Sequence, residues 1–224
     1  MRRLSSAAGL PVAFVLSAAL CVLASPWALD LPPVVWLSKP LTTMLVIVHA
    51  FDRGLDTPVP RRWVLIGLVA SLAGDVFLLW PQQGFLPGLV SFLLAHLAYL
   101  AAFTRTQRLA ARPWVFVGYA LLAASILWQL WTGVPGPLRA PVLAYVTCLA
   151  AMAAQAAVLW RSGAPRGPVL ALGGALFLCS DALLAFNKFA QPLPLASLWI
   201  LGSYWAAQWC IASWLGPRVA RPGP

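Results

Sequence analysis

Two aspartates lie inside apolar stretches, and their carboxyl groups are the clearest candidates for chemistry. Asp75 interrupts LAGDVFLLW (72–80) and Asp181 interrupts FLCSDALLAF (177–186), although the whole chain has only five acidic residues. An ionisable side chain in such a segment costs about 2.5–3.5 kcal/mol on insertion scales, so it persists where it has a task. Two carboxyl groups in one low-dielectric cavity tend to share a single proton, which suits general acid and general base catalysis on water. The alternative is a pair of structural, hydrogen-bonding acids.

Further polar side chains occupy the same apolar segments, at spacings that favour a common site. His96 and Tyr99 are three residues apart and Tyr204 and Gln208 are four apart, so each pair shares a helix face. A polar cavity in the outer half of the membrane would collect these groups together with the aspartates. The candidate catalytic residues are therefore Asp75 and Asp181, and the candidate substrate-binding residues are Lys39, His96, Tyr99, Asn187, Lys188, Tyr204 and Gln208.

Simpler roles remain open for several of these residues. Lys39 can extend to the lipid headgroups or neutralise an aspartate, and Lys188 lies near a segment end where a charge is readily solvated. His96 can join two helices through a hydrogen bond, and the tyrosines can serve packing.

Metal and cofactor chemistry is not expected. Glutamate is absent, the two histidines fall in different segments, and no CxxC pair occurs. The four cysteines instead suit helix packing: Cys21, Cys148, Cys179 and Cys210. No phosphate-binding glycine loop and no serine or cysteine nucleophile motif stands out.

The elements that must position these groups are membrane-spanning helices. The chain is 62% hydrophobic and 9% charged, which cannot supply the polar surface of a water-soluble domain. Its apolar blocks have the length needed to cross a bilayer as a helix, and they are separated by short Pro-, Gly- and Arg-containing linkers. We expect an all-α, polytopic membrane bundle, a single domain over 1–224, with eight spans at about 10–29, 34–51, 62–80, 85–103, 114–131, 140–160, 168–187 and 195–215.

The net charge of +10 reflects membrane topology in this interpretation, and nucleic acid is not an expected partner. With eight spans, one side of the membrane receives only Arg139 and Lys188. The other side receives twelve arginines: Arg2, Arg3, Arg53, Arg61, Arg62, Arg105, Arg108, Arg112, Arg161, Arg166, Arg218 and Arg221. The positive-inside rule places both termini in the cytoplasm. A cleaved signal peptide over the first span is the alternative, and it would leave seven spans.

A weak internal repeat relates the third and seventh spans. LVASLAGDVFLLW aligns with GALFLCSDALLAF, which places Asp75 over Asp181. Because these spans are four apart, two parallel four-helix repeats are predicted, with both aspartates at a similar depth.

Several motifs resemble the YhhN/TMEM86 family of eight-span membrane proteins. They are SKPLTT (38–43), GDVFLL (74–79), FLPGLVSFLLAHLAYLAAF (85–103) and LFLCSDALLAFNKF (176–189), in this order. The resemblance covers spans two to four and seven to eight. It places the family's motif residues at Lys39-Pro40, Asp75, His96 with Tyr99, Asp181 and Asn187.

The resemblance implies hydrolysis of the vinyl-ether bond of a lysoplasmalogen or a related lysolipid. The products would be a fatty aldehyde and glycerophospho-ethanolamine or -choline. A neutral aspartic acid would protonate the vinyl ether and its ionised neighbour would activate water, with Asp75 and Asp181 in either order. His96, Tyr99, Tyr204 and Gln208 would orient water and substrate oxygens. Lys39 and Lys188 would tune the acids or contact the phosphate.

Other functions fit the buried acids as well. One is a small-molecule or proton-coupled transporter, one an intramembrane aspartyl protease, and one a non-catalytic lipid-binding protein. The protease lacks support because CSD stands where a Tyr-Asp motif would be needed. The small, arginine-rich chain favours a multi-pass protein of a bacterial cytoplasmic (inner) membrane, whose partner is a lysophospholipid.

Overall fold

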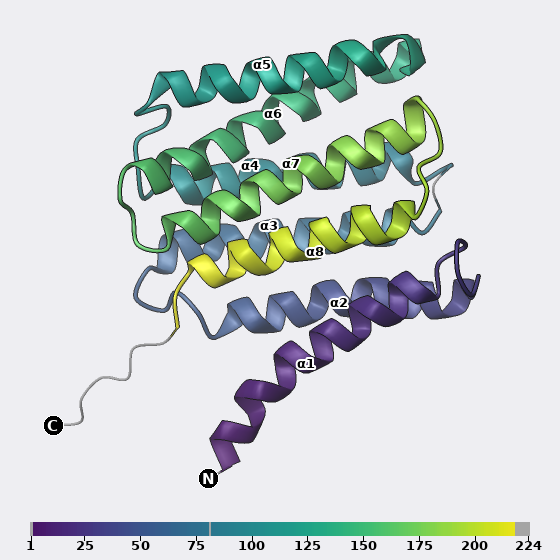
Figure 1. Ribbon diagram of the computed structural model, residues 1–224. Coiled ribbons are helices and arrows are strands. Elements are labelled where there is room, and N and C mark those ends of the chain that lie inside the picture. The colour runs from purple at the N-terminus through teal and green to yellow at the C-terminus, as the bar shows by residue number, and fades with distance from the viewer. Residues whose placement is uncertain (1, 81, 218–224) are drawn as a thin grey trace, which may run out of the picture.

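Eight α-helices make up the part of the chain that the computed structural model describes, residues 2–80 and 82–217, with side chains from residue 9 onward (Figure 1). The helices are α1 (Arg2–Leu23), α2 (Pro32–Phe51), α3 (Pro58–Phe77), α4 (Phe85–Thr104), α5 (Pro113–Leu130), α6 (Gly136–Arg161), α7 (Gly167–Phe189) and α8 (Ala196–Trp214). A short 3-10 turn, Trp131–Gly133, follows α5. No strand occurs in these ranges, which confirms the predicted all-α class.

Proline and glycine set most of the helix boundaries. Prolines occupy the first turn of α2, α3, α5, α6 and α7, where a missing backbone N–H costs nothing. The first helix differs from its predicted span of 10–29, because it begins at Arg2 and ends at Leu23. The chain turns after Leu23 through backbone hydrogen bonds from Asp30 to Ser25 and from Leu31 to Ala24. Arg218 and Arg221 lie outside the described residues.

Five of the helices are long and apolar enough to cross a membrane: α2, α4, α5 with its 3-10 turn, α6 and α7. The apolar part of α1 is shorter, Gly9–Leu23. The other two, α3 and α8, carry polar side chains that face the bundle interior, among them Ser71 and Asp75 on α3 and Gln208 on α8. Polar groups in a membrane protein belong on such inward faces.

Six helices form a closed ring, and the other two pack on its outside. Around the ring, α2 contacts α3, α3 contacts α4, α4 contacts α6, α6 contacts α7, α7 contacts α8, and α8 returns to α2. On the outside, α1 lies against α2 and α8, whereas α5 lies against α6 and α7 at the edge of the bundle (Figure 1). The contacts within the first four helices are thus largely repeated within the last four.

Consecutive helices alternate in direction, so the loops separate into two sets at opposite ends of the bundle (Figure 1). The α2–α3, α4–α5 and α6–α7 loops lie at the end where α1 begins and α8 ends, and these loops together with the helix ends that adjoin them carry most of the arginines. The α1–α2, α3–α4, α5–α6 and α7–α8 loops lie at the other end.

Glycines on α3 bring this helix close to α4. A Cβ atom on Gly67 would overlap the ring of Tyr99, and one on Gly74 would overlap the ring of Phe92. Small residues at helix contacts allow this close approach in membrane bundles. The two glycines thereby seat aromatic rings of α4 directly against α3, beside Asp75.

Candidate active site

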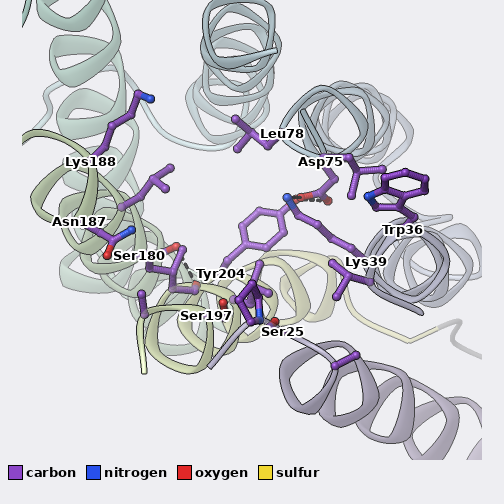
Figure 2. Close-up of a pocket in the computed structure, with 18 of the residues that line it drawn as sticks. Ser25, Trp36, Lys39, Asp75, Leu78, Ser180, Asn187, Lys188, Ser197 and Tyr204 are labelled. Atoms are coloured by element: carbon purple, nitrogen blue, oxygen red, sulfur yellow. Dashed lines mark hydrogen bonds and ion pairs between the residues drawn. The ribbon is translucent and has the colours of Figure 1, made fainter. Parts of the chain in front are cut away.

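One cavity of about 700 Å³ collects most of the predicted site residues. Its lining includes Lys39, Asp75, Asp181, Asn187, Lys188 and Tyr204. Other lining residues come from the α1–α2 loop, the end of α3 and the starts of α4 and α8, so the cavity reaches the end of the bundle that is poor in arginine. Figure 2 shows Tyr204 pointing toward Lys39 and Asp75, with Asn187 and Lys188 on the opposite side.

Asp75 is buried among partners that stabilise a carboxylate. Only 1% of the residue is exposed. Its Oδ2 atom accepts hydrogen bonds from the hydroxyls of Thr43 (2.6 Å) and Tyr204 (2.8 Å). The Nζ atom of Lys39 lies 3.9 Å from Oδ1. Thr43 is fixed in turn by the indole N–H of Trp205, which donates to its hydroxyl at 3.2 Å.

A chain of buried hydrogen bonds fixes the hydroxyl group of Tyr204. The amide of Gln208 donates to the Tyr204 hydroxyl (3.1 Å), and its carbonyl oxygen accepts from Tyr99 (2.6 Å). The Tyr99 hydroxyl also lies 3.4 Å from that of Ser71. Tyr99 and Gln208 lie outside the cavity lining. Their hydrogen bonds fix the phenol of Tyr204, which donates to Asp75.

Asp181 has a different environment. Its Oδ2 atom accepts a hydrogen bond of 2.5 Å from Tyr145 and lies 4.0 Å from Nε2 of His96. Among the side chains that the structure describes, in residues 9–80 and 82–217, no lysine or arginine nitrogen lies within 4 Å of this carboxyl group. The side chain is 13% exposed, toward the cavity.

His96 is buried in an aromatic enclosure beside Asp181. Its ring meets the rings of Tyr145 and Phe177 edge to face, at centroid distances of 5.2 and 4.6 Å. Neither ring nitrogen has a hydrogen-bond partner among the described residues. His96 is outside the cavity lining, so the nearest group that it can influence is the Asp181 carboxyl.

The surroundings of the two aspartates repeat between the halves of the chain. Asp75 on α3 receives a hydroxyl from α2 and another from α8, the last helix of the second half. Asp181 on α7 receives a hydroxyl from α6 and approaches a histidine on α4, the last helix of the first half. The two surroundings differ in one respect, because among the described side chains only Asp75 has a lysine nearby.

The remaining predicted residues lie toward the mouth of the cavity. Asn187 accepts a hydrogen bond from the backbone N–H of Leu193 (2.8 Å), which fixes the α7–α8 loop. Lys188 is exposed, and its ammonium lies 4.2 Å from the centre of the Phe85 ring.

Two polar contacts of the aspartates were not among the predicted site residues. Thr43 stands four residues after Lys39, and this helical spacing could have signalled it. Tyr145 had no comparable signal, because residues 140–150 around it contain no motif and no acidic or basic side chain.

The arrangement can perform acid–base chemistry at the inner end of the cavity. One carboxyl group is held by two hydroxyls and an ammonium, and the other by a single phenol. Groups whose environments differ in this way suit opposite protonation states. The described residues contain no group of three or more His, Cys, Asp or Glu side chains that could hold a metal ion.

Comparison with known proteins gives a family and several relatives. Residues 34–215 match the YhhN family. Lysoplasmalogenase TMEM86B of Sus scrofa is 37% identical over 178 residues, which cover 75% of this chain and 69% of that protein. Lysoplasmalogenase TMEM86A of Homo sapiens is 35% identical over 174 residues, covering 75% and 71%. A lysoplasmalogenase of Mycobacterium tuberculosis is 31% identical over 157 residues, covering 66% and 58%. No solved structure gives a significant match.

Proposed function

Because the chain belongs to the YhhN family, we propose that it is a membrane-embedded hydrolase that cleaves the vinyl-ether bond of a lysoplasmalogen or a closely related lysolipid. The products would be a fatty aldehyde and glycerophospho-ethanolamine or -choline. Relatives named lysoplasmalogenase support this activity. The observation that carries it is the pair of aspartates in unlike environments on one cavity.

The placement in the membrane is part of the proposal. The chain would form a single membrane domain in which all eight helices span the bilayer, with the polar faces of α3 and α8 turned toward the bundle interior. The arginine-rich loops would face the cytoplasm together with both termini, and the cavity would open on the external side of a bacterial inner membrane. Two parallel four-helix repeats are supported by the repeated packing order and by the matched surroundings of the aspartates.

In this proposal Asp75 is the ionised partner and acts as general base. Two hydroxyl donors and the Lys39 ammonium stabilise its negative charge in a site with almost no exposure to water. Hydrogen bonds and an opposite charge favour the ionised form of a carboxyl group. Lys39 therefore serves the base and is less available to a substrate phosphate.

Asp181 is the protonated partner and acts as general acid. A buried carboxylate with no cation beside it is costly, so the neutral form is favoured at this position. The Tyr145 hydrogen bond can persist through the reaction, because a phenol donates to a neutral carboxyl oxygen and more strongly to a carboxylate. His96 lies close enough to influence the Asp181 proton.

The reaction follows from these roles with all atoms accounted for. Asp181 transfers its proton to the β-carbon of the vinyl ether, and the π electrons form the new C–H bond, leaving an oxocarbenium ion. Asp75 removes a proton from water as the water oxygen bonds to the adjacent carbon, which gives a hemiacetal. The hemiacetal C–O bond to glycerol then breaks, the glycerol oxygen takes the proton from Asp75, and the hydroxyl proton returns to Asp181. Aldehyde and glycerophospho alcohol are released.

The other site residues serve this chemistry at greater distance. Lys188, exposed at the mouth, would meet the phosphate, and Asn187 would keep the mouth in shape through its bond to the α7–α8 loop. Tyr204 would direct the water toward Asp75, while Tyr99 and Gln208 hold Tyr204.

Aldehyde release by the purified protein tests the function. The protein in detergent is given a lysoplasmalogen in D₂O, and an ester-linked lysolipid with the same headgroup serves as the control. The proposal predicts aldehyde from the vinyl ether only, with one deuterium on the carbon next to the carbonyl. Fatty acid released from the ester at a similar rate, or no product from either lipid, contradicts it.

A further inference from the structure

Asp181 borders a second cavity as well as the 700 Å³ cavity that contains the charged site residues (the polar cavity). This crevice of about 60 Å³ lies between α5, α6 and α7. Its lining is apolar apart from Asp181 and Tyr145, the residue that donates to Asp181. The Asp181 side chain thus stands between the cavity that contains the charged site residues and a crevice whose other lining residues, apart from Tyr145, are apolar.

The crevice adjoins a larger apolar groove between α5 and α6. This groove has a volume of about 440 Å³, and it shares Ala123, Leu127 and Val146 with the crevice. Its one hydroxyl, on Thr147, donates to the carbonyl of Leu143 in its own helix and leaves the groove without a free polar group. The α5 side of the groove runs from Phe116 to Leu127, about 16 Å at 1.5 Å per residue.

The groove faces the bilayer. Helix α5 packs mainly on α6, α7 and its own 3-10 turn, and it lies at the edge of the bundle (Figure 1). Two residues of the groove wall, Val117 and Leu143, are 57% and 43% exposed. A lipid chain can therefore enter from the side, between α5 and α6, without passing through the charged cavity.

We propose that the α5–α6 groove and the crevice hold the aliphatic chain of the substrate, with its first carbons at Asp181 and its headgroup in the 700 Å³ cavity. This inference rests on the proposed function, which puts the scissile bond at Asp181. A vinyl ether is the junction between the apolar chain and the polar headgroup of its lipid. Asp181 is the residue that the polar cavity and the crevice share as lining.

The charged side chains of the polar cavity argue against placing the aliphatic chain there. Five acidic or basic side chains stand among its apolar lining residues: Asp30, Lys39, Asp75, Asp181 and Lys188. A long aliphatic chain there would displace water from Asp30 and Lys188, which have no ion-pair partner among the described side chains, and this is unfavourable. In the groove the same chain would meet only apolar walls and the bilayer.

Photolabelling of the wild-type protein tests the position of the chain directly. The probe is a 1-alkyl lysophospholipid, which lacks the vinyl group and is not cleaved, with a diazirine near the end of its chain. We expect labels on groove residues within 116–127 and 143–151, displaced by excess unlabelled lysolipid. A diazirine phospholipid with two chains is the control for bulk lipid at α5. Displaceable labels on Trp36, Leu78 or Leu79 of the polar cavity would overturn the proposal.

A second arm uses bulk at the narrowest part of the path. Ala123 is 7% exposed and lines both the crevice and the groove, so Ala123→Phe would close the passage. Leu121→Phe, on the lipid-facing side of α5 and 67% exposed, is the matched control. Each methylene buried from water is worth about a fourfold gain, so binding of a monomeric long-chain probe should fall tenfold or more. Leu121→Phe should bind as the wild type does.

Binding and labelling separate this inference from the proposed function. If no lipid yields aldehyde but the probe labels the groove and Ala123→Phe abolishes the labels, the chain site stands and the hydrolase proposal fails. If aldehyde is released and the groove is neither labelled nor sensitive to Ala123→Phe, the chain lies elsewhere. Ala123→Leu, a smaller change, replaces the phenylalanine variant if that variant does not fold.

Discussion

The hydrogen bond from Tyr145 to Asp181 should contribute to the rate of the chemical step. Tyr145→Phe removes this phenolic donor, 2.5 Å from Oδ2, and keeps the ring that packs edge to face on His96. In the ground state the bond joins two neutral groups, because Asp181 carries the proton. As the proton leaves, the acceptor becomes a carboxylate and the bond strengthens.

The magnitude follows from the change in the strength of this bond. A hydrogen bond between neutral groups contributes about 0.5–1.5 kcal/mol, and one to a charged group about 1.5–3 kcal/mol. Only the difference, about 1.4 kcal/mol, stabilises the transition state relative to the bound substrate. Loss of that difference lowers kcat about tenfold, and KM should stay unchanged because Tyr145→Phe keeps the ring that lines the crevice.

The assay is steady-state aldehyde release by purified Tyr145→Phe in detergent. Tyr119→Phe is the matched control, since the Tyr119 hydroxyl has no hydrogen-bond partner among the residues that the structure describes. In an Asp181→Asn background, Tyr145→Phe should cause no further loss, because both changes act through the same carboxyl group. Wild-type kcat in Tyr145→Phe, or an equal loss in Tyr119→Phe, refutes this reasoning.

Three further substitutions test other parts of the structure. Lys39→Met leaves the buried Asp75 carboxylate without its ammonium partner. The kcat of this variant should therefore fall at least about tenfold near neutral pH and recover partly as the pH rises. A pH profile of kcat that runs parallel to that of the wild type would contradict this. Gln155→Leu removes three hydrogen bonds to the α4–α5 loop, so it should lower the free energy of unfolding by about 1–3 kcal/mol. This loss is measured as a lower unfolding temperature. Gln129→Leu, at an exposed position, is the control and should leave the unfolding temperature unchanged. Lys188→Gln should raise KM by a factor of about three to ten with kcat unchanged, because an exposed ammonium contributes to substrate binding only. A fall in kcat would show instead that Lys188 takes part in the chemical step.

Much of the fold could be predicted from the sequence because hydropathy and helix-breaking residues act locally. The expected starts at about 34, 62 and 114 lie within four residues of the observed helix starts at Pro32, Pro58 and Pro113. The start of α1 at Arg2 was missed, because the residues before the apolar block extend the helix although they do not suit lipid. The family was also indicated by short motifs, and the match over residues 34–215 confirms it.

The site was harder to predict, because residue spacing shows which side chains share a helix face but not which helix that face packs against. The pairing of Lys39 with Asp75, and not with Asp181, depends on α2 lying against α3 in the ring. Tyr145 stands on a helix without motifs and reaches Asp181 only because α6 packs on α7. For the same reason no spacing rule could place His96 behind Asp181 and outside the cavity.

The central claim is that Asp75 and Asp181 form one catalytic pair with separate tasks. The direct measurement is aldehyde release from a lysoplasmalogen by Asp75→Asn and Asp181→Asn, beside Asp52→Asn at the arginine-rich end as the matched control. Binding of the uncleavable 1-alkyl lysolipid shows that each variant is folded. The account predicts a loss of about 10²–10⁴-fold in each of the first two variants, with binding kept and Asp52→Asn unaffected. Undiminished aldehyde release by either folded variant would contradict it.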